Sequence, residues 1–442
     1  MNPALARKGG VNSPCLVFAD EKGRVYDHPE LEATGMKAGR LFRLEARNLV
    51  KLPSSSELFM LPQRSAVGFD PNTGEFIEVD TDPYSEEGRP AFAVAAFIPP
   101  GYALTHSTAY HERSGAAMLP LFAYAACVFW RGDFYATAFR VDPDFRHDER
   151  FLDPMAVSTG VANYLTLFPQ NRLVPHLAVC ATVNGCANAK NFFLGRFEAP
   201  IPTSPVCNAQ CQGCISLQPA GRIPSTQKRI EFTPSPEEIA ELALFHIQHV
   251  PDPIVSFGQG CEGEPSLSVD VIEKALKLIR KSTSKGTLNM NTNAGRPDFI
   301  ARLFDAGLTN IRVSLNSVRD PYYSLYYQPR GYSLNDVMRS IYAAKARGGF
   351  VSINYLSMPG FTDSEGEAAA LEECIAQKHI DMVQWRNLNY DPIQYFRDLG
   401  LEGKETPMRG MAEHVAAIGR AFPRLRMGYF NPVKAATAAG DL

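Results

Sequence analysis

The chain carries the stretch Cys207-Asn208-Ala209-Gln210-Cys211-Gln212-Gly213-Cys214, in which three cysteines have the spacing C-x3-C-x2-C. Thiolate is the soft ligand of iron–sulfur clusters, which usually take four ligands. This spacing differs from the bacterial ferredoxin run, and no fourth cysteine follows Cys214 at short range. A cubane held by only three thiolates leaves one iron open to a substrate or cofactor. The motif therefore predicts a catalytic cluster, with a zinc site or unrelated thiols as the alternatives.

The composition is that of an ordinary globular protein. The chain has 442 residues, 45% of them hydrophobic and 21% charged, so about two domains are expected. A net charge of −3 argues against broad binding to nucleic acid or to anionic membranes. There is no apolar run of transmembrane length, and residues 1–10 lack an apolar signal core, so the cytoplasm is the expected location. Nine cysteines, an odd number, fit free thiols and a metal site better than a disulfide framework.

Residues 1–195 are predicted to form an accessory domain that is mostly β or α+β. Short β-rich runs recur there between turn residues, as in 91–98 and 134–139. The apolar segment Ala116 to Trp130 fits either a buried helix or a strand, because its periodicity does not decide. The role of this domain is left open.

From residue 196 to residue 400 the pattern becomes regular. A helix begins at Ser235, which can cap it, followed by Pro236 at the first helical position. Ser333 and Asp336 form a second capping pair. Strands are expected at Ile254–Gly258, Leu288–Asn293, Ile311–Ser317, Val351–Met358 and Met382–Leu388, with helices at 269–281, 297–306, 334–347 and 365–377 between them. With a strand leading into the cysteine stretch this makes six β/α units, which implies parallel strands. Residues 401–442 are expected to be a C-terminal helix and tail.

The predicted strands alternate polar and apolar residues. Arg312, Ser314 and Asn316 interleave with apolar neighbours, and Gln384 and Arg386 do so in the last strand. A period of two places each polar set on one face of its strand. Since helices must cover the apolar face, the polar face points inward, and we expect it to line a ligand cavity.

The cysteine spacing resembles the signature of the radical S-adenosylmethionine (radical SAM) superfamily. A second motif, Gly260-Cys261-Glu262-Gly263-Glu264-Pro265, resembles the G-G-E-P loop of that family, with Glu262 in place of the first glycine. The resemblance implies a fold of the α/β class, a partial (β/α)6 TIM-like barrel. It also implies two cofactors: a [4Fe-4S] cluster on Cys207, Cys211 and Cys214, and S-adenosylmethionine on the open iron.

The resemblance further implies which side chains contact S-adenosylmethionine at the carboxyl ends of the strands. Glu264 matches the acid of the family loop, and Arg386 suits a carboxylate. One departure is Gly213, where the family usually carries an aromatic residue beside the adenine. The complete expected cofactor-binding set is Gly213, Glu262, Gly263, Glu264, Pro265, Asn291, Asn293, Ser314, Asn316 and Arg386.

The implied activity is reductive cleavage of S-adenosylmethionine to a 5′-deoxyadenosyl radical that abstracts hydrogen from a substrate. A small polar substrate fits the polar lumen. A peptide or protein substrate, recognised by the N-terminal domain, is the alternative within the class. The alternative from another class is an iron–sulfur redox sensor or electron carrier. The expected partners are the substrate and an electron donor such as flavodoxin or ferredoxin, with neither nucleic acid nor membrane.

Three other groups of residues are interpreted as structural, and a fourth is left open. His106, His111 and Glu112 fit no ligand template, so surface or packing roles are expected. Cys180 and Cys186 are expected to be buried structural cysteines, because two thiolates are too few for an auxiliary cluster unless Cys127 or Cys261 joins them. Packing is also expected for Cys261 itself, although it adjoins the cofactor loop. The tyrosines 322, 323, 326 and 327 fit a packed helix as well as a substrate mouth.

Overall fold

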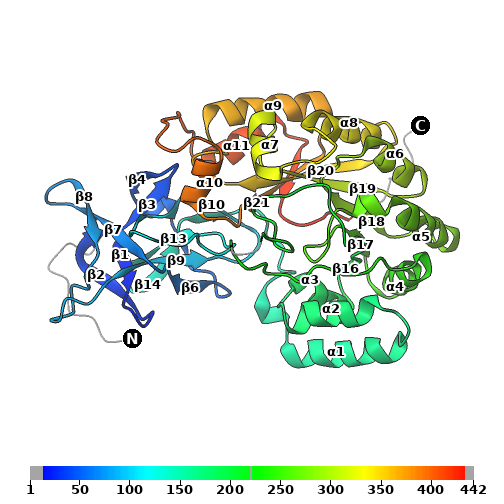
Figure 1. Cartoon of the computed structure of the whole chain (residues 1–442), viewed down its shortest axis with the longest axis horizontal. Helices are drawn as coiled ribbons and strands as arrows, with labels where there is room; N and C mark the ends of the chain where they lie inside the picture. The colour runs from blue at the N-terminus through cyan, green and yellow to red at the C-terminus, as the bar shows by residue number, and fades with distance from the viewer. Residues whose placement is uncertain (1–12, 220–221, 434–442) are drawn as a thin grey trace.

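The computed structural model describes residues 13–219 and 222–433, and the N-terminal part of it is a large sheet (Figure 1). Its central strands run in the order β12-β7-β2-β1-β9-β13-β11-β3-β4, and they pair in antiparallel fashion. The strands are β1 (Cys15–Ala19), β2 (Val25–Glu32), β3 (Thr34–Lys37), β4 (Arg40–Arg43), β5 (Val50–Lys51), β6 (Glu57–Met60), β7 (Arg64–Asp70), β8 (Glu75–Val79), β9 (Phe92–Phe97), β11 (Ser107–Thr108), β12 (Tyr110–Glu112), β13 (Ala125–Trp130) and β14 (Asp133–Ala136). A separate pair joins β10 (Tyr102–Leu104) to β15 (Ala138–Arg140).

The last part of the apolar segment Ala116 to Trp130, which fitted either a helix or a strand, is the strand β13. Its alanines and Val128 are buried between neighbouring strands. After the sheet come three helices: α1 (Pro154–Leu167), α2 (Leu173–Thr182) and α3 (Ala187–Phe193). Their buried side chains, such as Tyr164 and Phe192, belong to the same hydrophobic core as the parallel sheet described next. Short 3-10 turns lie at Ala46–Asn48 and Glu149–Phe151. The three-part division of the chain stays a prediction.

The second sheet has seven strands in sequence order, and all of its pairings are parallel. The strands are β16 (Glu198–Pro200), β17 (Ile254–Phe257), β18 (Thr287–Thr292), β19 (Asn310–Leu315), β20 (Phe350–Ser357), β21 (Met382–Asn387) and β22 (Arg426–Gly428). This confirms the partial barrel and each of the expected strands. The difference is β22, which lies beyond residue 400 in the segment expected to be a helix and tail.

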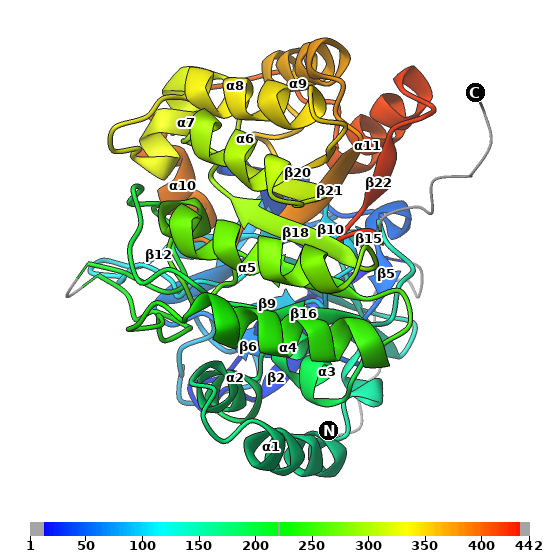
Figure 2. The same cartoon turned by 90° about the vertical axis from the view of Figure 1, so that its right-hand side faces the viewer.

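Helices cover the apolar face of this sheet, and Figure 2 shows α4, α5, α6, α8 and α9 side by side on it. They are α4 (Pro236–His249), α5 (Val269–Ser282), α6 (Pro297–Asp305), α8 (Leu334–Lys345) and α9 (Glu365–Lys378), joined by α7 (Asp320–Tyr327), α10 (Pro392–Asp398), α11 (Met411–Ala421) and the 3-10 turn Pro265–Ser268. Both predicted caps are confirmed, since Ser235 and Ser333 each form a capping box. No helix in the described part of the chain is long and apolar enough to cross a membrane.

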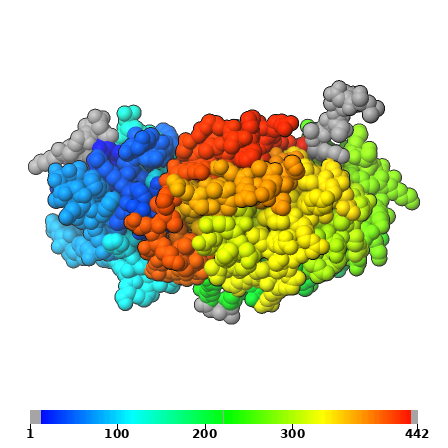
Figure 3. Space-filling model, turned by 90° about the horizontal axis from the view of Figure 1, so that it is seen from above, coloured from blue at the N-terminus to red at the C-terminus, as the bar shows by residue number. Residues whose placement is uncertain are grey.

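The N-terminal sheet packs against the carboxyl end of β21 and against α10. Figure 3 shows the blue N-terminal part beside orange residues of the later chain. Asn387 accepts a hydrogen bond from the Leu104 backbone (2.9 Å) and donates one to the Tyr102 carbonyl (2.9 Å). Asp391, which is only 1% exposed, accepts from Tyr110 (3.1 Å) and pairs with Arg64 at 3.3 Å. A buried ion pair with further hydrogen bonds fixes the relative position of two elements, because losing one partner leaves a buried charge. The accessory sheet is therefore held beside the functional end of the barrel.

The polar strand face points inward, as predicted, but its lower layer is filled by the chain itself. Asn431, which follows β22, donates to Glu198 of β16 at 2.9 Å. Its side-chain oxygen lies 3.2 Å from the Gln384 amide and 3.4 Å from the Arg312 guanidinium. One asparagine thus bridges the first strand, β16, to β19 and β21. The expected ligand-lining role is left to the side chains nearer the carboxyl ends of the strands.

A buried histidine on α11 makes the fold less stable in acid. The His414 ring lies edge-on against Trp385 with ring centroids 5.5 Å apart, and neither ring nitrogen has a hydrogen-bond partner in the described chain. Burial lowers the pKa of His414 to about 4 from an ordinary value of 6.5. Since the unfolded chain binds this proton first, the stabilisation is complete above pH 6.5 and is lost as the pH falls towards 4.

We expect His414→Leu to reduce this loss. Between pH 7.5 and pH 5 the variant should lose about 2 kcal/mol less free energy of unfolding than the wild type. Denaturant titrations at the two pH values measure the difference. The matched control is the exposed His249→Leu, which should keep the wild-type dependence. An unchanged pH dependence in His414→Leu would contradict the assignment.

Candidate functional site

The three cysteines of the predicted motif lie on one loop, residues 207–214, which we call the cysteine loop. It follows β16 and is fixed to α7 by backbone hydrogen bonds from Gln210 to the Tyr327 carbonyl (3.1 Å) and from Gln212 to the Tyr326 carbonyl (2.9 Å). All three cysteines are half-buried free thiols. Tyr326 and Tyr327 of α7 therefore lie against the cysteine loop and are buried, which favours the packed helix over the substrate mouth for these two tyrosines.

A cavity of about 280 Å³ opens beside the loop and is lined by Cys211, Cys214, Gln218, Arg222, Arg229 and their neighbours. Arg229 places a guanidinium nitrogen 3.6 Å from the Cys214 sulfur and also donates to Ser216 at 3.0 Å. Arg229 thus places a positive charge beside one of the three sulfurs. The donor set, three thiols with an adjacent cavity and a cation, fits an iron–sulfur cluster. No motif in the sequence indicated that Arg229 would lie beside the cysteine loop.

Charge and burial act together on the thiols. Burial, followed by the nearby Glu264 carboxylate, raises the pKa of Cys207 to about 11. Burial and the other two thiols raise the pKa of Cys211 well above its usual value. Cys207 and Cys211 therefore keep their protons near neutral pH until a metal centre displaces them. These interactions also place Glu264 and the cysteines in one electrostatic environment.

The loop after β17, residues 260–265, lies against the segment that leads into the cysteine loop. Gly263 donates to the Ser204 carbonyl (2.6 Å), and Glu264 donates to the Val206 carbonyl (2.8 Å). A Cβ on Gly263 would lie 2.0 Å from the Val206 oxygen, so only glycine fits. The two predicted motifs are therefore brought together by main-chain contacts.

The structure explains why a glutamate, Glu262, stands where the resembling loop has its first glycine. Its carboxylate accepts from the backbone of Thr203 (2.7 Å) and Ser204 (3.0 Å) on one segment, and from Gly258 (2.6 Å) and Gln259 (2.7 Å) on the other. Burial raises the pKa of Glu262 to about 7 against the opposing effect of these donors. The residue is absent from the positions with positive φ, so the strain that replacing a glycine would bring does not arise. Its side chain ties loops together and leaves only its backbone for a ligand.

Glu264 is buried, with 3% of its surface exposed, at the carboxyl ends of β17 and β18. Its two oxygens accept from the backbone of Ser266 (3.0 Å) and Asn293 (2.8 Å) and from the hydroxyl of Thr292. Pro265 begins the 3-10 turn that Glu264 caps. The carboxylate is thus held in one orientation beside Cys207.

The predicted asparagines and serine on β18 and β19 occupy different levels of the site. Asn293 donates to the Asn208 side chain of the cysteine loop at 2.7 Å. Asn291 lies deeper and donates to the Gly258 carbonyl at 3.0 Å. Asn316 donates to Tyr395 at 3.1 Å, while its side-chain oxygen is buried without a partner in the described chain. Ser314 is half-buried on the inward face of β19.

Two arginines project from the inward strand face. Arg386 donates to the Tyr429 carbonyl (2.9 Å) and its guanidinium stacks 4.2 Å from the Tyr429 ring centre. Arg312 is deeper, and burial together with the charge of Arg386 lowers the pKa of Arg312 to about 9. Within the described residues neither guanidinium has a carboxylate within 4.0 Å. Two such cations facing one lumen favour an anionic ligand.

Other protein groups fill the space that a side chain at position 213 would need. A Cβ there would meet the Tyr326 hydroxyl at 2.7 Å and the Asn389 carbonyl at 3.3 Å. The aromatic residue that the resemblance implied at this position has no room. Protein groups already occupy the corresponding space.

The histidines of the N-terminal sheet do not form a site. His106 is buried, with its ring edge-on to Phe42. His111 pairs with Glu78 at 3.0 Å, and Glu112 pairs with Arg397 at 2.8 Å. The structural interpretation of His106, His111 and Glu112 is consistent with these separate partners.

Comparison with known families gives one match. The family model described as "Radical SAM superfamily" matches residues 201–371. The matched residues include the cysteine loop, the 260–265 loop and strands β17 to β20.

Several solved structures are similar to the chain at low identity. The structure "Native anSMEcpe with bound AdoMet" is 15% identical with a TM-score of 0.35, and the match covers 44% of this chain and 52% of that chain. Methylornithine synthase (PylB) is 13% identical with a TM-score of 0.37, covering 62% and 78%. Streptococcus suis SuiB bound to S-adenosylmethionine is 15% identical with a TM-score of 0.37, covering 62% and 63%. The chain thus spans about half the length of the first of these, and the identities are too low to transfer residue roles.

The contact at Gly263 gives a prediction. Gly263→Ala should separate the 260–265 loop from residues 204–206, because the new Cβ would meet a backbone oxygen at 2.0 Å. We expect the iron content after reconstitution to fall to less than about half that of the wild type, and the free energy of unfolding to fall by about 1–3 kcal/mol. The matched control is Gly366→Ala, whose Cβ would meet only the end of the Arg319 side chain at 3.2 Å. Wild-type iron content and stability in Gly263→Ala would show that the close approach is not required.

Proposed function

Residues 201–371 are a domain of the radical SAM superfamily, whose members are enzymes, and from this premise we propose the reaction of the chain. The chain binds a [4Fe-4S] cluster through Cys207, Cys211 and Cys214, with S-adenosylmethionine on the remaining iron. When bound, the cluster would supply one electron for the cleavage of S-adenosylmethionine to a 5′-deoxyadenosyl radical, the group that would take hydrogen from the substrate. The observation that carries the proposal is the cysteine loop fixed by main-chain hydrogen bonds against the loop that bears Glu264.

The chain's own residues would bind and orient the cofactor. Glu264 receives the ammonium of the methionyl group, because its carboxylate is already oriented by three donors beside Cys207. The backbone of Glu262, Gly263 and Pro265 completes that contact, while the Glu262 side chain stays with its own donors. Holding reacting groups in a fixed geometry is the main contribution that a protein makes to cofactor chemistry.

The ribose and adenine contacts come from the neighbouring strands. The buried, unpartnered oxygen of Asn316 is an acceptor for a hydroxyl, and Ser314 lies on the same strand. Asn291 and Asn293 support this surface from β18. Adenine meets the backbone at Gly213, since no aromatic side chain fits there.

The substrate we propose is small and polar, and a one-electron donor of the flavodoxin or ferredoxin type reduces the cluster. A polar strand face at the carboxyl ends of parallel strands suits such a substrate better than an apolar one. A peptide substrate would need contacts from the accessory sheet, which is held beside β21 through Asn387 and Asp391.

The test is an anaerobic assay. The protein is reconstituted with iron and sulfide, reduced and given S-adenosylmethionine, and 5′-deoxyadenosine is measured. We expect product above a Cys211→Ala control, even if slowly and without substrate, because removing one of three ligands abolishes the catalytic form of the cluster. No product from a chain carrying a full, reducible cluster would favour the redox-sensor alternative.

The two unpaired arginines generate a second prediction. Arg386 would pair with the carboxylate of S-adenosylmethionine or of the substrate. If the partner is S-adenosylmethionine, Arg386→Gln should raise its Kd at least about tenfold, since removing one partner of a buried charge pair costs about 1.4 kcal/mol or more. Equilibrium dialysis measures this, with the exposed Arg424→Gln as control. An unchanged Kd would leave the substrate as the partner of Arg386 and contradict the assignment to the cofactor.

A further inference from the structure

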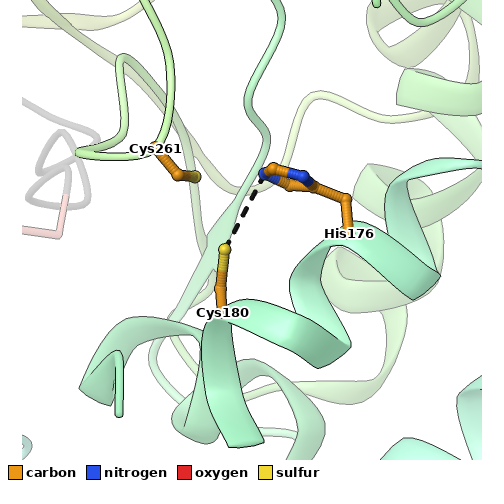
Figure 4. A group of neighbouring side chains, drawn as sticks. All are labelled: His176, Cys180 and Cys261. Atoms are coloured by element: carbon orange, nitrogen blue, oxygen red, sulfur yellow. Dashed lines mark hydrogen bonds between the residues drawn. The ribbon is translucent and has the colours of Figure 1, made fainter. Parts of the chain in front are cut away.

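A second cluster of metal-binding side chains lies outside the proposed reaction site. His176 and Cys180 are one turn apart on α2, and Cys261 lies on the 260–265 loop. Figure 4 shows the three side chains pointing toward one another from these two elements. One ligand atom from each lies within 4.8 Å of the other two. Elements that are distant in sequence thus converge on one point.

The spacing of the ligand atoms fits a single metal ion. Zinc binds sulfur at about 2.3 Å and imidazole nitrogen at about 2.0–2.1 Å, so tetrahedral ligands lie roughly 3.5–3.8 Å apart. The Cys180 sulfur lies 3.7 Å from the His176 nitrogen Nε2. The same distance also fits a weak hydrogen bond between thiol and imidazole, so distance alone does not separate the two explanations.

Burial and ligand chemistry favour the metal. Cys180 and Cys261 are only 2% and 5% exposed, and His176 is half-buried. Two thiols and an imidazole are soft and intermediate ligands, the set that zinc prefers over harder ions. The group of ligand atoms that lie within 4.8 Å of one another comprises these three side chains and does not include Cys186. The fourth position is then left to water.

We propose that His176, Cys180 and Cys261 bind one zinc ion, separately from the iron–sulfur cluster. On binding, the two thiols lose their protons to solvent and no electron is transferred. The ion would fasten α2 to the 260–265 loop directly before Glu262. The expected packing roles of Cys180 and Cys261 would then be replaced by a ligand role. This proposal does not depend on the proposed reaction.

The first measurement is the zinc content of the full chain, made alongside iron and labile sulfide. The same measurement is made on a chain in which Cys207, Cys211 and Cys214 are changed to Ala, so that zinc held by the cysteine loop is excluded. We expect about one zinc per chain in both proteins. Replacing it with Co²⁺ should give thiolate charge-transfer absorption and the strong visible bands of a tetrahedral ion.

The matched variants are His176→Gln and Cys180→Ser in the chain without the cysteine-loop thiols. Each should lower zinc affinity at least a hundredfold, measured by competition with a chelator. Cys374→Ser, another buried cysteine, should keep zinc binding. His176→Gln keeps the proposal testable if Cys180→Ser does not fold, because His176 is half-buried and the far-UV circular dichroism spectrum reports folding.

Three results would overturn the proposal. The first is the absence of stoichiometric zinc in both proteins after anaerobic purification with zinc supplied. The second is zinc that persists with wild-type affinity in His176→Gln. The third is a disulfide between Cys180 and Cys261 in the anaerobically purified protein, which would make the pair a redox couple.

Discussion

The site depends on one buried carboxylate. Glu262 accepts backbone hydrogen bonds from residues 203–204, which lead into the cysteine loop, and from residues 258–259, which follow β17. A carboxylate is suited to this because it only accepts and has two oxygens for several donors. Without it, four backbone N–H groups would lose their partner, and leaving either of the two buried ones, at Thr203 and Ser204, unpaired costs about 1–3 kcal/mol. The register between the two loops follows from this contact, and so does the position of Glu264 beside Cys207.

Three other parts of the molecule support the contact between these two loops and the site around it. Helix α7 holds the cysteine loop from below through the carbonyls of Tyr326 and Tyr327. The accessory sheet is fixed beside β21 through Asp391, so its edge lies near the carboxyl ends of the strands. Asn431 closes the lower lumen by bridging the first strand to later ones. The remaining polar face carries Arg386 above Arg312. There a negatively charged ligand is attracted most strongly, because the surrounding dielectric constant is low.

Local signals in the sequence predicted the parts of the fold that depend on local physics. Ser235 and Ser333 cap helices because their side chains act within three residues, and the alternation in β19 sets which face is polar. The cysteine spacing predicted the cysteine loop because its three thiols also lie within a few residues of one another. What the sequence could not predict depends on distant pairing. Glu262 was expected to act in the cofactor loop, and nothing local indicates its donors at 203–204. His176 and Cys180 have helical spacing, but Cys261 joins them only through the packing of α2 on that loop.

We propose that three thiolates leave one iron open beside Glu264 and that S-adenosylmethionine occupies it. The most direct measurement is the EPR spectrum of the reduced, reconstituted protein before and after S-adenosylmethionine is added. We expect a changed spectrum, because the amino and carboxylate groups of S-adenosylmethionine would become ligands of the open iron. A fully reduced [4Fe-4S] signal that stays the same at saturating S-adenosylmethionine would contradict it.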